Sequence, residues 1–99
     1  MNYHRAVGAL AALLIASSAF AFTGEQYLKQ AKIEPGAARK LALKVYPGKI
    51  VDEELEQESG GSGLRYSFVI RHHHANHEVG IDAKTGAVLE NSVEGPHPD

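Results

Sequence analysis

The stretch over residues 64–93 dictates the architecture more strongly than any other part of this 99-residue chain. Apolar and polar side chains alternate over residues 64–71, which is the pattern of a strand with one buried face. A second strand follows and presents an apolar face of its own. The predicted core face of this hairpin consists of Tyr66, Phe68, Ile70, Val79 and Ile81.

Turn-forming residues flank these strands. Residues 59–63 are rich in Gly and Ser and predict a flexible turn before the first strand. Residues 82–86 have the chemistry of a tight turn, in which Asp82 can cap and Gly86 can adopt positive φ. Val88, Leu89 and Val93 then continue the sheet.

A helix is predicted between Pro35, at its first position, and Gly48, just beyond its end. One apolar stripe recurs at helical spacing, formed by Ala38, Leu41, Ala42 and Val45. The basic residues Arg39, Lys40 and Lys44 are expected on the other face. Pro47 disfavours helical geometry at the preceding residue and stops the helix. A shorter, marginal helix is predicted over residues 22–32.

An acidic strand is predicted over residues 50–58, with Val51 and Leu55 on its apolar face. Its acidic run comprises Asp52, Glu53, Glu54, Glu56 and Glu58. A solvated strand face that discourages edge-to-edge aggregation explains such a run, and a recognition surface for a basic partner is the alternative. Alternate carboxylates on a flat strand do not wrap a metal cation.

The first residues have the layout of a secretory signal peptide. Arg5 gives a basic start, residues 6–15 are apolar, and Ala19 and Ala21 form an Ala-x-Ala cleavage site. An uncleaved membrane anchor is the alternative, since the apolar run is near the lower limit for a membrane span. Cleavage after Ala21 would remove one of ten Lys and Arg residues and leave nine against twelve Asp and Glu residues.

This mild acidity argues against nucleic acid as a partner, because phosphate binding needs a clustered basic surface. The chain has no cysteine, which excludes disulfides, thiolate chemistry and a lipidated cysteine. A domain of this size without such staples has a small core. The expected fold is α+β, with one main helix and a short N-terminal helix on an antiparallel sheet of three to four strands.

This order of elements resembles the PepSY domain. The resemblance covers about residues 34–93 and rests mainly on two stretches, residues 38–48 and residues 79–89. It implies a helix packed across an antiparallel sheet and a module that binds and restrains peptidases or other envelope proteins. It brings no catalytic motif, so no residue inherits a catalytic role. Together with the sequence patterns outside the resemblance, the expected division is a signal peptide over 1–21, a helical lead-in over 22–33, a PepSY-like domain over 34–94 and a disordered tail over 95–99.

Four histidines lie where the hairpin turns. If Ile70 faces Ile81, His74 faces His77 across a four-residue loop with Ala75 and Asn76 at its tip. His72, His74 and His77 would then share one face and could hold Zn²⁺, Cu²⁺ or Ni²⁺. A solvated polar turn, with adventitious metal binding or none, is the alternative.

Two functions are therefore predicted for a periplasmic or secreted bacterial protein that is a monomer or weak dimer. The first is a non-enzymatic module that binds an exported or envelope protein such as a peptidase, through an exposed sheet edge or face. The second is a periplasmic metal-binding protein that uses His72, His74 and His77. No cofactor is expected apart from those metals, and no stable membrane insertion is expected after signal cleavage. An enzyme is disfavoured, since the chain has no cysteine, no Ser-His-Asp signature and no Gly-rich phosphate loop. Ser67 and Asp82 lie near histidines in the sequence, but Asp82 is better explained as a turn cap.

Overall fold

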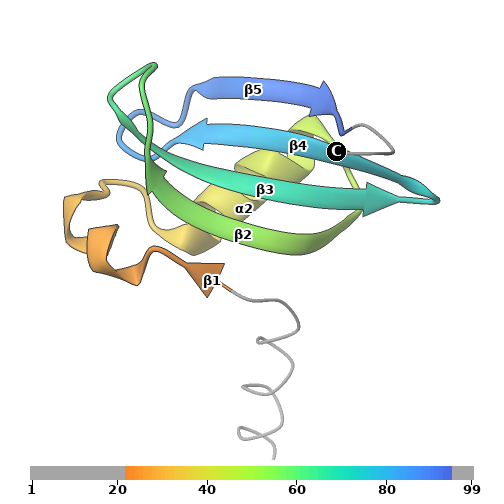
Figure 1. Ribbon diagram of the computed structural model, residues 1–99, viewed down its shortest axis with the longest axis horizontal. Helices are drawn as coiled ribbons and strands as arrows, with labels where there is room; N and C mark the ends of the chain where they lie inside the picture. The colour runs from red at the N-terminus through yellow and green to blue at the C-terminus, as the bar shows by residue number, and fades with distance from the viewer. Residues whose placement is uncertain (1–21, 95–99) are drawn as a thin grey trace, which may run out of the picture.

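The computed structural model describes residues 22–94 (Figure 1). The predicted signal peptide over 1–21 and the predicted tail over 95–99 lie outside the described residues. Within residues 22–94, no helix is long and apolar enough to cross a membrane.

A five-stranded sheet with one main helix forms the domain. Its strands are β1 (Phe22–Thr23), β2 (Lys49–Gln57), β3 (Leu64–His72), β4 (Ala75–Asp82) and β5 (Val88–Val93), in the order β1-β2-β3-β4-β5. The helix α2 (Pro35–Val45) crosses one face of this sheet, as Figure 1 shows. The predicted α+β class is confirmed. The predicted three to four strands were too few, because β1 is only two residues long, pairs parallel to β2, and is too short to show alternation.

The helix α2 begins and ends where the sequence predicts. Pro35 occupies its first turn, and Tyr46 after its end is extended with φ −144°, as expected of a residue before proline. Ala38 and Ala42 are fully buried against the sheet. Their small side chains let the helix lie close to β3 and β4.

The short N-terminal helix is a 3₁₀ helix, η1 (Glu25–Gln30), rather than an element spanning residues 22–32. Gly24 separates it from β1 with φ 97°. A Cβ atom at Gly24 would lie 1.9 Å from the carbonyl oxygen of Leu55, so only glycine fits against β2 at this turn.

The predicted core face of β3 and β4 is confirmed, but the predicted pairing is wrong. Ile70 lies opposite His77 and not Ile81, so its partner is displaced by four residues. An even displacement keeps every side chain on its predicted face. Tyr66, Phe68, Ile70, Val79 and Ile81 are accordingly all fully buried.

The register differs because the hairpin closes through a two-residue turn. His73 and His74 form this turn, and His72 faces Ala75 directly. His73 has φ 60°, the positive value that tight hairpin turns require at their first central position. The predicted four-residue loop with Ala75 and Asn76 at its tip therefore does not form.

Asp82 joins two loops at the other end of the sheet. Its carboxylate accepts hydrogen bonds from the backbone amides of Lys84 and Thr85, as the predicted turn cap requires. It also accepts hydrogen bonds from the amide and the hydroxyl of Ser62, at 2.6 and 2.8 Å. Burial alone would raise the pKa of Asp82, but these donors lower it to about 2.

Candidate functional site

Two of the four hairpin histidines, His72 and His77, contact Tyr46, the residue that follows α2. The His77 ring stacks on the Tyr46 ring at a centroid distance of 4.0 Å, and His72 meets the same ring edge-on at 6.0 Å. Gly48 allows this approach, since a Cβ atom there would lie 2.5 Å from the carbonyl oxygen of Arg71. No periodic pattern in the sequence predicts this role of Tyr46, because the role depends on the contact between the helix end and the hairpin.

The structure brings together two of the three predicted metal ligands. His72 and His77 both contact Tyr46, whereas His74 lies in the turn. The Nε2 atom of His77 is hydrogen-bonded to the side-chain oxygen of Asn91. Over residues 22–94, no group of three or more His, Cys, Asp or Glu residues is placed to hold a metal ion. Metal binding by these histidines stays a prediction.

The sheet has one long edge strand without a neighbour among the described residues. β5 is last in the sheet order and pairs only with β4 (Figure 1). It contains neither lysine nor proline, the residues that commonly protect such edges. Val88 and Val93 are 48% and 70% exposed. This edge therefore offers an unpaired backbone together with apolar side chains.

The free backbone groups of β5 can be assigned. The amide of Glu94 donates to the carbonyl of Asn76 across the β4–β5 pair. Amide directions alternate along a strand, so the amides of Asn91 and Val93 point away from β4. These two amides are the donors that an added strand would use.

The opposite edge of the sheet is less open. β1 pairs with Glu53 and Glu54 in the middle of β2, and η1 also contacts β2. The remaining β2 edge carries the acidic run, which repels an approaching acidic strand. β5 is therefore the better edge for strand addition.

The sheet face opposite α2 is acidic. The strand register places Glu54, Glu56, Glu78 and Glu90 on this face together with Arg65. Burial raises the pKa of Glu78, and the nearby carboxylates raise it further. Arg65 offsets part of this charge, with its guanidinium 3.6 Å from Glu90 and hydrogen-bonded to the carbonyl of Ser59. The predicted alternative for the acidic run, a surface for a basic partner, is consistent with this face.

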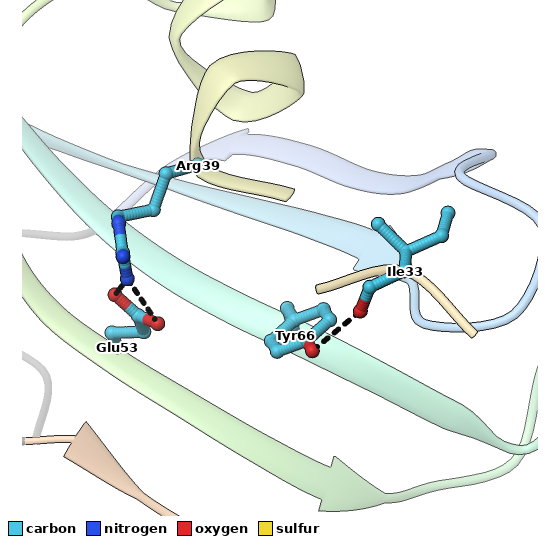
Figure 2. Close-up of polar contacts among 4 residues, drawn as sticks. All are labelled: Ile33, Arg39, Glu53 and Tyr66. Carbon is cyan, nitrogen blue, oxygen red and sulfur yellow. Dashed lines mark hydrogen bonds and ion pairs between the residues drawn. The ribbon is translucent and has the colours of Figure 1, made fainter. Parts of the chain in front are cut away.

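Glu53 departs from the rest of the acidic run because it is fully buried under α2. A bulge between Ile50 and Asp52 shifts the register, so that both Ile50 and Glu53 face the helix. One guanidinium nitrogen of Arg39 lies 3.0 Å from each carboxylate oxygen of Glu53 (Figure 2). Arg39 was expected on the solvent face of the helix, but it turns toward the sheet. Burial raises the pKa of Glu53, while Arg39 opposes that rise.

A second polar contact ties the segment before α2 to the sheet. The buried Tyr66 hydroxyl donates to the carbonyl of Ile33 at 2.7 Å, as Figure 2 shows. Burial raises the pKa of Tyr66. The sequence does indicate the unusual position of Glu53, since this residue falls between Val51 and Leu55 on the predicted apolar face.

The triad-like residues have structural partners. The Ser67 hydroxyl donates to the Glu56 carboxylate at 2.7 Å, on the acidic face of the sheet. The Asp82 carboxylate is committed to the two loops that it joins. Neither residue is oriented toward a histidine by these contacts.

A helix laid across a mostly antiparallel sheet that ends in the edge strand β5 defines a small α+β module. The family model described as "Peptidase propeptide and YPEB domain", PepSY, matches residues 32–91. The chain belongs to the PepSY family. This match runs from the segment before α2 through most of β5 and confirms the resemblance drawn from the sequence. Neither the curated proteins nor the solved structures gave a significant match.

Proposed function

We propose that this protein is a non-enzymatic, exported binding module that holds or restrains a peptidase or another protein of the cell envelope. The observation that carries the proposal is the unprotected edge of β5. An extended segment of the partner adds to this edge, its carbonyls accept hydrogen bonds from the outward amides of Asn91 and Val93, and its side chains pack beside Val93.

Membership in a family named for peptidase propeptides supports a peptidase as the partner. The contacts of Ser67 and Asp82 support a non-enzymatic role, since both side chains stabilise the fold.

Export rests on the sequence of residues 1–21. Mass spectrometry of the protein recovered from the periplasm or medium tests it, and a chain that begins at Phe22 is the expected result.

A proline variant tests the docking edge. Val93→Pro removes an amide that points away from β4, so the β4–β5 hydrogen bonds remain. Val93→Thr is the matched control, because it keeps the amide and the strand propensity. Envelope peptidases from the producing cell are mixed with each variant, and complex formation and peptidase activity are measured.

We expect Val93→Thr to bind and inhibit as the parent does. We expect Val93→Pro to lose binding by about tenfold or more, since at least one charge-neutral hydrogen bond and its neighbouring contacts are lost. Equal binding by the two variants would remove strand addition at β5 from the proposal.

A metal-binding function for His72, His74 and His77 is the second candidate. The observation in its favour is that two of these three histidines, His72 and His77, lie near enough to each other to contact the same side chain, that of Tyr46. Its test is a metal titration.

A further inference from the structure

A lysine-rimmed groove runs along α2 and the segment before it, over residues 32–44. It has a volume of about 610 Å³. Ile33, Ala37 and Leu41 form its apolar floor, and Lys32, Lys40 and Lys44 line it as well. One carboxylate, that of Glu34, completes the lining. The groove therefore combines an apolar surface with an excess of positive charge.

The three lysines are available for an anionic ligand. All three are exposed, and within residues 22–94 the ion pairs involve other residues, Arg39 with Glu53 and Arg65 with Glu90. Lys40 and Lys44 are one helical turn apart, so their Cα atoms are separated by about 6 Å along the axis. Carboxylates repeated at a similar spacing on a helix or a strand would match them.

The wall of the groove opposite α2 is fixed before any ligand arrives. The amides of Lys32 and Ile33 both donate to the carbonyl of Ala83, at 2.9 and 3.0 Å. The Tyr66 hydroxyl holds the carbonyl of Ile33 (Figure 2). A preformed groove does not need to be ordered during binding, which reduces the entropic cost of association.

We infer that this groove binds an acidic, amphipathic segment of a partner protein. Leucine-like side chains of that segment cover Ile33, Ala37 and Leu41, and its carboxylates face Lys32, Lys40 and Lys44. Charge complementarity determines the choice of occupant. Because the rim lysines and Ala37 are exposed, a ligand here stays partly in solvent, as a docked peptide does, whereas small-molecule sites enclose most of their ligand.

This inference rests on the proposed function in one respect, because it takes the occupant from a protein partner. It adds a second contact surface and the chemistry of the segment that occupies it. A partner that engages both the β5 edge and the groove would gain affinity from their linkage.

Peptide titration of the exported, ¹⁵N-labelled protein tests the groove. The probe is a short helical peptide in which Glu recurs every fourth position beside Leu, and its control carries Gln in place of Glu. Two-dimensional NMR spectra follow the amides of the protein. We expect saturable changes at Ile33, Ala37, Leu41 and the three lysines with the Glu peptide, and much weaker binding of the Gln peptide.

Charge-reversal variants locate the interaction. Lys40→Glu combined with Lys44→Glu should weaken binding of the Glu peptide by about tenfold or more, since two attractive rim contacts become repulsive. The control of equal charge is Lys29→Glu combined with Lys49→Glu, at two exposed lysines outside the groove, which should change the affinity by less than about twofold. Equal effects of the two charge reversals would overturn the inference.

Other occupants give distinct results, each of which overturns it. Sodium dodecanoate that shifts the groove amides when the peptide does not would indicate an amphiphilic small molecule. Concentration-dependent shifts of the same amides without any peptide would indicate a second copy of this chain.

Val93→Pro should leave peptide binding unchanged. Failure of peptide binding at the groove is thereby distinguished from failure of strand addition at the β5 edge.

Discussion

Arg39 on α2 and Glu53 on β2 form an ion pair across the interface between helix and sheet. One nitrogen of the guanidinium lies 3.0 Å from each carboxylate oxygen of Glu53. The two ends of the pair differ in solvation, since the Glu53 side chain is 0% exposed and that of Arg39 is 38% exposed. Removing the cation and removing the anion should therefore have different costs.

Arg39→Met should destabilise the protein by about 3 kcal/mol at neutral pH, because it leaves a buried carboxylate without its cation. The pH dependence has a definite sign. The folded-state pKa of Glu53 lies above its ordinary value of 4.5. Ionisation of Glu53 therefore lowers the free energy of unfolding as pH rises from 4.5 through the folded-state pKa. Without Arg39 that pKa rises further, and the penalty should shrink as pH falls toward 4.5.

Urea unfolding at several pH values measures this effect. Lys40→Met is the matched control, because Lys40 is an exposed neighbour on the same helix without an ion pair among the described residues. A penalty for Arg39→Met that does not change with pH would contradict the proposed role of the buried carboxylate.

Asp82 should make the protein sensitive to strong acid. Its folded-state pKa is about 2 against an ordinary value of 3.8. The stabilisation that the ionised Asp82 side chain contributes is fully present above pH 3.8 and is lost as the pH falls toward 2. The difference corresponds to about 2 kcal/mol. Asp82→Asn should remove this pH dependence, and Asp52→Asn, at an exposed carboxylate, should retain it.

Unfolding free energies measured between these two pH values test the prediction for Asp82. They also test whether Asp82 connects its own turn to the loop that contains Ser62. If Asp82 capped only its own turn, Ser62→Ala would leave stability unchanged, whereas the observed hydrogen bond from the Ser62 hydroxyl predicts a loss of about 1 kcal/mol.

His73→Gly should stabilise the hairpin by about 1 kcal/mol, because glycine adopts φ 60° without the cost that a side chain imposes. His74→Gly is the matched control and should not stabilise, since His74 has no positive φ. Thermal unfolding of the two variants measures the difference. In the four-residue loop predicted from sequence, His73 would lie in the strand and glycine there would destabilise.

The fold could be predicted where the signal is local. The period-two alternation of β3 identified the core face, and proline and glycine placed both ends of α2. The hairpin register could not be read from alternation, because displacements by two or four residues bury the same side chains. The Arg39–Glu53 pair joins residues 14 positions apart, and it depends on how α2 lies across β2, which no local pattern reveals.

The candidate site was less predictable than the core. The open edge of β5 depends on the strand order, which no single strand reveals. The histidines were recognised as a cluster, but their neighbour Tyr46 comes from the far end of α2. Sequence reasoning therefore located the residues of interest and missed the element that contacts them.

Metal titration decides whether the histidines have a role beyond the turn. The ring of His77 stacks on Tyr46 and is hydrogen-bonded to Asn91, so a metal ion would have to compete with these contacts. We expect Zn²⁺, Cu²⁺ and Ni²⁺ to bind weakly and to shift mainly the NMR signals of the exposed His72 and His74. His72→Ala with His74→Ala should abolish the shifts, and His77→Ala should leave them in place. Stoichiometric binding at micromolar affinity that requires all three histidines would instead favour the metal-binding function, because it would show that the hairpin rearranges around the ion.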